Sequence, residues 1–224
     1  MCSESSATVV TIDGPSGAGK GTLSQLLAQR LGYRLLDSGA LYRLVALASM
    51  NKGIAADDEA ALSSCASTLD VEFAPADGGV TVLLEGVDVT MAIRQEHVSM
   101  RASEVAAVEL VRAALLQRQR DFAVAPGLVA DGRDMGTTVF TGAQYKFYLT
   151  ASAEARAQRR YQQLCERGES VDLAVLIEDI QARDERDQSR ATSPLRPASD
   201  AHVVDSTNMT IEQVLEQMLA TIDA

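Results

Sequence analysis

The sequence has no tryptophan and few other aromatic side chains, with five tyrosines and four phenylalanines in 224 residues. Bases of single-stranded nucleic acids stack on such rings, so this composition offers no evident platform for them. Basic residues are also in the minority, since 20 of them face 31 acidic residues and the formal net charge is −11. A surface of this charge disfavours general binding to nucleic acids or anionic membranes, and we expect neither as a partner.

Long apolar runs and paired cysteines are missing as well. No stretch of 18 apolar residues occurs, and the first residues lack the basic and apolar segments of a secretory signal. Cys2, Cys65 and Cys165 are odd in number and far apart, without the spacing of a metal site or a redox pair. We therefore expect free thiols in a reducing cytoplasm. The length suits one α/β domain with a large core.

The most informative segment is a glycine-rich stretch between an expected strand and an expected helix. Val9, Val10 and Ile12 form a short apolar strand, and the apolar spacing of 22–31 predicts a helix. Glycine N–H groups can close around phosphate oxygens, and the helix start adds unpaired donors and a positive dipole end. Lys20 supplies a mobile charge for the terminal phosphates of a nucleoside triphosphate. The residues of this predicted P-loop are Gly14, Pro15, Ser16, Gly17, Ala18, Gly19, Lys20, Gly21 and Thr22.

One position departs from the usual P-loop pattern. Ser or Thr normally follows the lysine, whereas Gly21 follows Lys20 here and Thr22 comes next. Taken without its surroundings, the segment could be an ordinary glycine-rich turn with an incidental lysine. The strand before it and the helix after it favour phosphate binding.

Strand and helix patterns alternate along the rest of the chain, which predicts an α/β fold with a parallel sheet flanked by helices. Expected strands lie at 33–36, 128–130, 145–149 and 202–204. Expected helices lie at 40–51, 57–69, 103–123 and 153–165. Another is expected to follow the polar turn at 166–169 and to end at about 188, and a terminal helix should follow the capping box at 210–213. Between about 70 and 100, apolar residues alternate around Asp77-Gly78-Gly79 instead, which predicts an inserted β-hairpin.

Two polar clusters follow predicted strands, at 37–43 and 131–136. In a doubly wound sheet such strand ends border the ligand crevice. A P-loop alone is compatible with a GTPase, an ATPase motor or a small-molecule kinase. The guanine-reading motif Asn-Lys-x-Asp is not present, because the segment 51–54 reads Asn-Lys-Gly-Ile.

Three segments together resemble the bacterial cytidylate kinases: 14–22, 37–43 and 131–137. Many nucleoside monophosphate kinases share the first segment, including its Lys-Gly-Thr form, which accounts for Gly21. The other two segments and the predicted hairpin are more specific, and the resemblance extends over nearly the whole chain. It implies a P-loop NTPase-type domain over 1–224 that transfers the γ-phosphate of ATP to CMP or dCMP. The implied parts are a core of about 1–69, 101–155 and 173–224, a monophosphate-binding insert at about 70–100 and a short helical lid at about 156–172.

The resemblance also implies how the ATP side works. Lys20, Arg133, Arg159 and Arg160 are the expected catalytic residues, and Thr22 and Asp131 are expected to hold Mg²⁺, partly through water. Arg156 would join Arg159 and Arg160 in the lid, which excludes water when it closes. For each of these three lid arginines, a solvated basic helix face is the simpler alternative.

On the acceptor side, the resemblance implies nine CMP-binding residues: Ser38, Arg43, Ser103, Arg112, Arg133, Asp134, Arg183, Asp187 and Arg190. Arg43, Arg133 and Arg190 would bind the phosphate, since arginine offers a bidentate fork and a permanent charge. Ser103, Arg112 and Asp134 would read cytosine, and Arg183 and Asp187 the ribose. Alternatives remain from the residues alone: Arg43 or Arg133 could pair with Asp37 or Asp134, and Ser103 and Arg112 could be ordinary helix-surface residues.

Two other functions remain compatible with the sequence. A kinase of another small acceptor, such as UMP, dTMP or shikimate, could use the same core. A catalytically silent nucleotide-binding switch is a second possibility, although such a protein need not retain both a P-loop lysine and acceptor arginines. We expect the chain to act as a monomer with ATP and CMP or dCMP as its partners.

Overall fold

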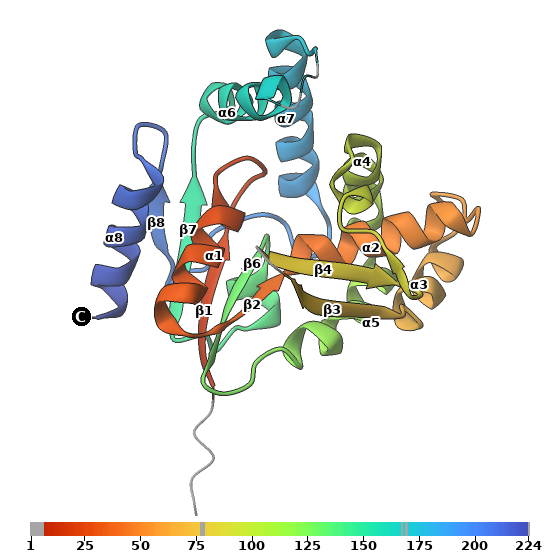
Figure 1. Ribbon diagram of the computed structural model, residues 1–224, viewed down its shortest axis with the longest axis horizontal. Coiled ribbons are helices and arrows are strands. Elements are labelled where there is room, and N and C mark those ends of the chain that lie inside the picture. Colours follow the sequence, from red (N-terminus) through yellow and green to blue (C-terminus); the bar gives the residue numbers. More distant parts are fainter. Residues whose placement is uncertain (1–6, 77–78, 167, 169, 224) are drawn as a thin grey trace, which may run out of the picture. The chain divides into compact units, whose positions relative to one another are not determined.

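The structure is a computed structural model that describes residues 7–76, 79–166, 168 and 170–223 (Figure 1). By its internal contacts the chain divides into two compact units. The first unit comprises Met1–Asp37 and Arg120–Ala224, and the second comprises Ser38–Gln119.

The first unit is built on a parallel sheet with the strand order β2–β6–β1–β7–β8. The strands are β1 (Thr8–Asp13), β2 (Arg34–Asp37), β6 (Gly127–Gly132), β7 (Tyr145–Thr150) and β8 (His202–Asp205). Because the strands share one direction, their carboxyl ends meet at one edge, where Asp13 lies opposite Gly132 and Asp37 opposite Asp131. The predicted α/β class with a parallel sheet is confirmed.

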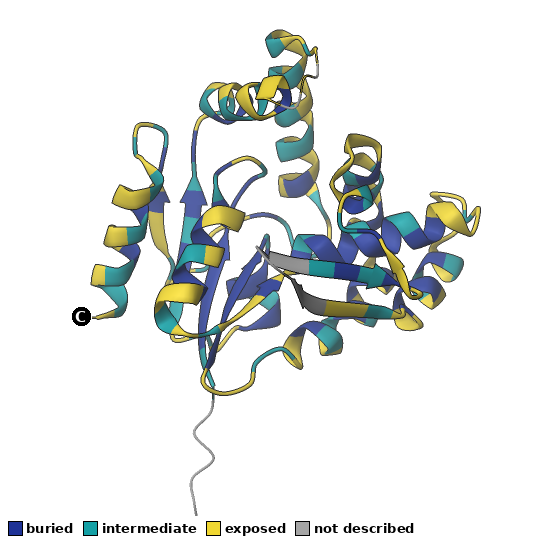
Figure 2. Ribbon diagram, viewed as in Figure 1, coloured by how far each residue is buried: buried dark blue, intermediate teal, exposed yellow. Residues whose placement is uncertain are grey.

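Helices cover this sheet because apolar side chains alternate along its strands. Val10 and Ile12 of β1 point to the same side and join Leu23, Leu27 and Met218 in one fully buried cluster. Figure 2 shows the central strands of the sheet as almost entirely buried. The helical elements of this unit are α1 (Lys20–Leu31), the π-helical turn η2 (Met135–Val139), α6 (Ala153–Glu166), α7 (Leu173–Ser189) and α8 (Ile211–Ile222). The apolar cluster thus joins α1 and α8 to the sheet and holds the loop between β1 and α1 above its carboxyl edge.

The second unit combines helices with a small antiparallel sheet of strand order β3–β4–β5. Its elements are α2 (Ser38–Asn51), α3 (Glu59–Ser67), β3 (Val71–Ala76), β4 (Gly79–Leu84), β5 (Val87–Asp88), η1 (Ala92–Arg94), α4 (Glu96–Val105) and α5 (Glu109–Arg120). The predicted hairpin is confirmed, since β3 and β4 pair antiparallel with Val71 opposite Leu84. Asp77 and Gly78 of its predicted turn lie outside the described residues. The unit extends beyond 70–100 on both sides.

The prediction of one helix over 103–123 is wrong. The chain forms two helices there, α4 and α5, separated by a turn at 106–108. The carbonyl of Ala106 accepts a hydrogen bond from the Arg112 guanidinium at 3.0 Å, so a side chain satisfies this carbonyl at the end of α4. Sequence periodicity contains no sign of that contact.

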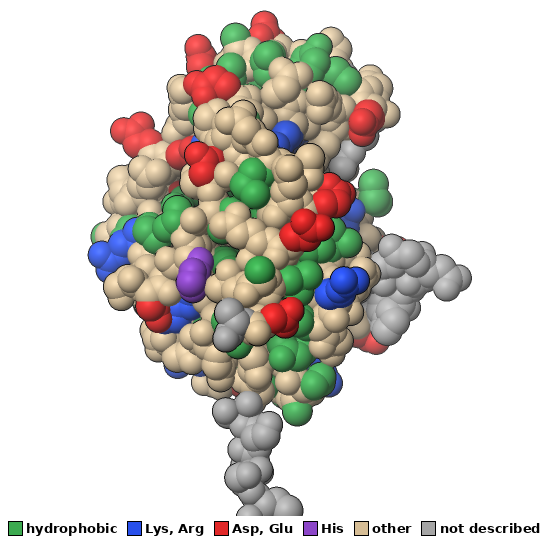
Figure 3. Space-filling view, turned by 90° about the vertical axis from the view of Figure 1, so that its left-hand side faces the viewer, with side chains coloured by type: hydrophobic (Ala, Val, Ile, Leu, Met, Phe, Trp, Pro, Cys, Tyr) green, Lys and Arg blue, Asp and Glu red, His purple; other side chains and the backbone are tan. Residues whose placement is uncertain are grey.

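Other predicted local features are confirmed. Helix α8 begins with the capping box of Thr210 and Gln213, in which each side chain bonds to the other residue's backbone. None of the described helices combines the length and the apolar composition that a bilayer crossing requires. On the face shown in Figure 3, Lys and Arg side chains form small separate groups rather than one basic patch, in keeping with the low basic content.

Candidate functional site

The P-loop lies between β1 and α1 and depends on glycine at two of its turns. Gly14 has φ 149°, and a Cβ there would lie 2.0 Å from the carbonyl oxygen of Leu149 in β7. Gly19 caps the start of α1 with φ 96°, a conformation that disfavours other residues. The chain can therefore turn tightly and present the first N–H groups of α1. The predicted order of strand, glycine loop and helix is confirmed.

Lys20 is the first residue of α1 and lies inside the P-loop, with 6% of its surface exposed. Its Nζ donates a hydrogen bond to the carbonyl oxygen of Pro15 at 2.9 Å and lies 3.9 Å from Oδ1 of Asp131. Burial, together with the positive charge of Arg133, lowers the pKa of Lys20 to about 7. The Lys20 side chain is therefore held within the P-loop by Pro15 and Asp131.

Asp131 and Thr22 were predicted to hold a metal ion, and their chemistry fits Mg²⁺. Asp131 is buried in β6, and a Cβ at Gly21 would lie 3.7 Å from its Oδ2, so the carboxylate lies directly beside the P-loop. Thr22 is exposed in the first turn of α1. Within the described ranges, no group of three or more His, Cys, Asp or Glu side chains could form a metal cage. Mg²⁺ usually needs only one or two protein oxygens plus water and phosphate, so this donor set suits it.

A second cluster of charged side chains is centred on Asp187 of α7. The Arg133 Nε donates to Oδ2 of Asp187 at 3.0 Å, and Arg190 donates to its Oδ1. Burial opposes ionisation of Asp187, but Arg133 and Arg190 outweigh it and lower the pKa of this carboxyl. Burial likewise opposes the charge of Arg133, and Asp187 outweighs it and raises the arginine's pKa. Arg183, on the same helix, also lowers the pKa of Asp187. Arg133 and Arg190 thus contact one carboxylate, and the charge of Arg183 acts on it as well.

The structure identifies Asp187 as a carboxylate partner of Arg133, a pairing that the alternatives with Asp37 and Asp134 did not include. Asp134 itself is 2% exposed and lies at the N-cap position of η2, where its side chain makes no capping hydrogen bond. Arg190 follows the last residue of α7, Ser189, as its C-cap. The structure therefore brings Arg133, Asp187 and Arg190 into contact, while their role in binding CMP stays a prediction.

In the second unit, two predicted base-reading residues are buried rather than on a helix surface. Ser103 is 6% exposed, and its Oγ has no hydrogen-bond partner among the described residues. Arg112 is 8% exposed, and its guanidinium carbon lies 5.5 Å from the centre of the Tyr42 ring. The helix-surface alternative for both residues is wrong. A buried hydroxyl without a partner is costly unless a ligand supplies one.

Ser38 and Arg43 lie in the first turns of α2, also in the second unit. Ser38 is buried and donates to the side-chain oxygen of Gln119 at 2.7 Å. Arg43 is half-buried. Gln119 is 1% exposed, and its hydrogen bond holds the Ser38 hydroxyl in one orientation. The sequence did not predict this contact, because 81 residues separate the two side chains.

Comparisons with known proteins decide which kinases these features belong to. The family model described as "Cytidylate kinase" matches residues 10–224. The chain is 58% identical over 216 residues to "Cytidylate kinase" of Stutzerimonas stutzeri (strain A1501), covering 96% of this chain and 94% of that protein. It is 56% identical over 216 residues to "Cytidylate kinase" of Aliivibrio salmonicida (strain LFI1238), covering 96% of each chain.

The chain belongs to the cytidylate kinase family. The family and the kinase class predicted from the sequence are thereby confirmed. Among solved structures, a gluconokinase from Sinorhizobium meliloti 1021 matches with a TM-score of 0.47 at 15% identity, covering 97% of this chain and 91% of that one. A likeness of that size adds nothing to the assignment.

The predicted lid arginines differ in their surroundings. Arg156 is 3% exposed, so the solvated-face alternative is wrong for this residue. Its guanidinium binds both carboxylate oxygens of Asp184 in α7 and donates to the P-loop carbonyl of Ser16 at 3.0 Å. Arg159 donates to the carbonyl of Ser206 at 2.6 Å, and Arg160 is half-buried. Of the predicted lid turn at 166–169, residues 167 and 169 lie outside the described residues.

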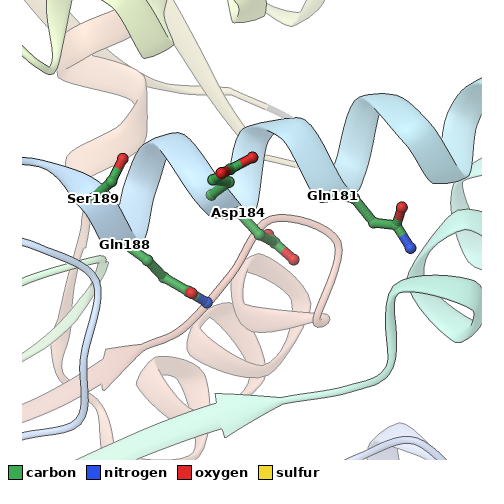
Figure 4. Close-up of a pocket in the computed structure, with 5 residues that line it drawn as sticks. Gln181, Asp184, Gln188 and Ser189 are labelled. Carbon is green, nitrogen blue, oxygen red and sulfur yellow. The ribbon is translucent and has the colours of Figure 1, made fainter.

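The face of α7 that carries Asp184 borders an open hollow of about 410 Å³ (Figure 4). The lining residues are Gln181, Asp184, Glu185, Gln188 and Ser189. Asp184, which lines this hollow, is also linked to the P-loop, because Arg156 contacts both Asp184 and Ser16. Sequence reasoning did not identify Asp184, whose partner is 28 residues away.

Asp13, the last residue of β1, is the other residue that sequence reasoning missed. It is 4% exposed, and its Oδ1 and Oδ2 accept the backbone N–H groups of Met135 and Gly136, each at 2.8 Å. Burial raises its pKa to about 7, although the two N–H groups oppose the shift. A carboxylate at the end of an apolar strand was a signal that the sequence analysis could have used.

The raised pKa of Asp13 predicts a pH-dependent stability. In the unfolded chain the carboxyl has its ordinary pKa near 3.8, so between about pH 4 and 7 the folded state binds more protons. The protonated Asp13 carboxyl therefore contributes to the free energy of unfolding below about pH 4, and this contribution is lost as the pH rises towards 7. We expect Asp13→Asn to flatten the decline in unfolding free energy over that range, measured by urea denaturation at several pH values. An equal slope in both proteins would contradict the prediction.

Proposed function

We propose that this chain transfers the γ-phosphate of ATP to CMP or dCMP, giving ADP and CDP or dCDP. The observation that carries the proposal is the pairing of two positive sites within one structural unit of a cytidylate kinase family member. One site is Lys20 in the P-loop, and the other is the arginine cluster around Asp187. Phosphoryl transfer needs mainly positioning and charge neutralisation, which these groups supply.

On the donor side, the P-loop N–H groups bind the ATP phosphates and Lys20 neutralises charge on the terminal ones. Asp131 and Thr22 would hold Mg²⁺, partly through water. The ion would supply positive charge that offsets the charge of the ATP phosphates. The proximity of Asp131 to both Lys20 and Gly21 supports this assignment.

The residues proposed to bind CMP belong to one or the other of the two units. In the first unit, Arg133 and Arg190 bind the phosphate, Arg183 and Asp187 the ribose, and Asp134 the cytosine amino group. The contacts of Arg133 and Arg190 with Asp187 and the burial of Asp134 support these roles.

In the second unit, Ser38 is a proposed CMP-binding residue, Arg43 binds the phosphate, and Ser103 and Arg112 bind the base. The unpartnered Ser103 hydroxyl supports a ligand there, because burial without a hydrogen bond is costly. Contact with Tyr42 fixes the Arg112 guanidinium in one orientation before any ligand binds.

A comparison of acceptors tests the proposal. We expect turnover of CMP and dCMP with ATP and Mg²⁺ to exceed that of UMP, dTMP, AMP and shikimate, measured as ADP release in a coupled assay. Preference for another acceptor would identify a different kinase on the same core. ATP binding without turnover of any acceptor would favour a catalytically silent switch.

Arg156, Arg159 and Arg160 belong to a lid over ATP in this proposal, and 70–100 closes over CMP. We expect amide hydrogen exchange within 156–172 and 70–100 to slow when an ATP analogue and CMP bind together, because closure excludes water. Mass spectrometry of the free and doubly bound protein measures this. Exchange that ligands leave unchanged in both segments would argue against the lids.

We also assign the enzyme to the cytoplasm and expect a monomer. The free thiols of Cys65 and Cys165 support a reducing compartment. Cell fractionation tests the compartment, and size-exclusion chromatography with light scattering tests the monomer.

A further inference from the structure

The five-residue turn η2 begins immediately after the segment that carries Arg133 and Asp134. The first N–H groups of any helical turn lack partners within the turn, and a side chain at the N-cap position usually accepts one of them. Asp134 occupies that position and is among the residue types that cap best. Its side chain nevertheless makes no capping hydrogen bond.

Asp13 caps this turn instead, from a different strand. Its two carboxylate oxygens accept the N–H groups of Met135 and Gly136 at 2.8 Å, across 122 and 123 residues of sequence. The contact is tight, because a Cβ at Gly136 would lie 3.4 Å from Oδ2 of Asp13 and 3.0 Å from the Thr11 hydroxyl. The start of the turn is therefore fixed against the end of β1.

Asp13 also lies where the P-loop begins, since Gly14 follows it directly. The charges that act on its carboxylate include those of Asp134 and Lys20, so it lies among the groups proposed to bind both substrates. A side chain at this point can hold the acceptor-binding segment in a fixed position relative to the P-loop.

We propose that Asp13 is a positioning residue for CMP recognition: it caps the turn at Met135–Val139 from β1, so that Asp134 does not cap its own turn and instead reads the base. The inference rests on the proposed role of Asp134. When Asp13 is replaced, we expect the Asp134 carboxylate, which occupies the N-cap position, to turn towards the N–H groups of η2. Cytosine then loses its acceptor.

Asp13→Asn tests this proposal. The asparagine amide keeps one oxygen that can accept a backbone N–H of Met135 or Gly136, but it places an NH₂ donor against the other N–H, so the cap is weakened. We expect KM for CMP to rise about tenfold and the CMP-over-UMP ratio of kcat/KM to fall, while KM for ATP changes less than about twofold. Asp58→Asn is the matched control, since Asp58 is an exposed N-cap carboxylate that accepts the N–H of Ala61 at 2.9 Å. It should leave all three constants unchanged. Equal loss for CMP, UMP and ATP would overturn the proposal, because a merely structural role predicts that result.

A double-mutant cycle separates this inference from the proposed function. If Asp13 acts through Asp134, the variant that carries both Asp13→Asn and Asp134→Asn should have the CMP-over-UMP ratio of Asp134→Asn alone. Additive losses would overturn the inference. A normal ratio in Asp134→Asn alone would instead overturn the base-reading role on which it rests. If Asp13→Asn yields no folded protein, Asp13→Glu keeps two acceptor oxygens on a longer side chain that displaces the turn. The same CMP-specific rise in KM is expected from it, and uniform loss would again overturn the proposal.

Discussion

Replacing Lys20 with alanine should lower kcat by about 10² or more, because the P-loop would lose its charge for the terminal phosphates of ATP. Lys20 lies in a buried site 3.9 Å from Oδ1 of Asp131, so the substitution also removes one cation beside this carboxylate. Steady-state kinetics with CMP as the acceptor measure the effect. Its expected size is the largest among the substitutions considered.

Truncation of Lys20 to alanine also removes packing, because its side chain is buried. Lys20→Met keeps an apolar side chain of similar length and should retain the fold while losing the same activity. Lys52→Ala serves as the control, since Lys52 is an exposed lysine 2.7 Å from Glu85. Turnover near the normal rate in Lys20→Met would contradict the assigned role of the P-loop.

Asp134→Asn should narrow the preference for CMP over UMP. Cytosine presents an amino group to an acceptor, whereas uracil presents a carbonyl that a carboxylate repels. The asparagine amide can both accept and donate, so it tolerates either base. We expect a loss of about 1–3 kcal/mol in discrimination, mostly through a lower kcat/KM for CMP.

Kinetics with both acceptors at saturating ATP measure that loss. Should Asp134 only support the loop that carries Arg133, the two activities should fall in proportion. A proportional fall would leave Ser103 and Arg112, both buried in the second unit, as the remaining candidates for reading the base.

Local sequence patterns were sufficient to predict the parts of the site that depend on neighbouring residues. The strand from Thr8 to Asp13, its glycine turn and the helix from Lys20 were predictable because apolar periodicity and glycine conformation act over a few residues. The polar segments after β2 and β6 could be placed at one edge because parallel strands share a direction. The hairpin within 70–100 and the capping box of α8 were predictable for the same local reasons.

The boundary between α4 and α5 was not predictable in this way, because the Arg112 side chain satisfies a carbonyl six residues earlier and the helical pattern continues through the turn. Residue types also could not distinguish a buried arginine from a solvated one. Arg156 is buried because Ser16 and Asp184 surround it, and these lie 140 and 28 residues away.

The sequence alone therefore determined the parallel class of the sheet, the P-loop and the family resemblance, all of which depend on short-range patterns and residue identity. The strand order of the sheet came from the structure. Only the tertiary structure decided which charges meet. It pairs Arg133 with Asp187 across 54 residues and Asp13 with the turn at Met135 across 122 residues. The physical reason is that folding brings distant groups together in a buried, weakly screened environment, where position rather than residue type sets their pairing and their pKa values.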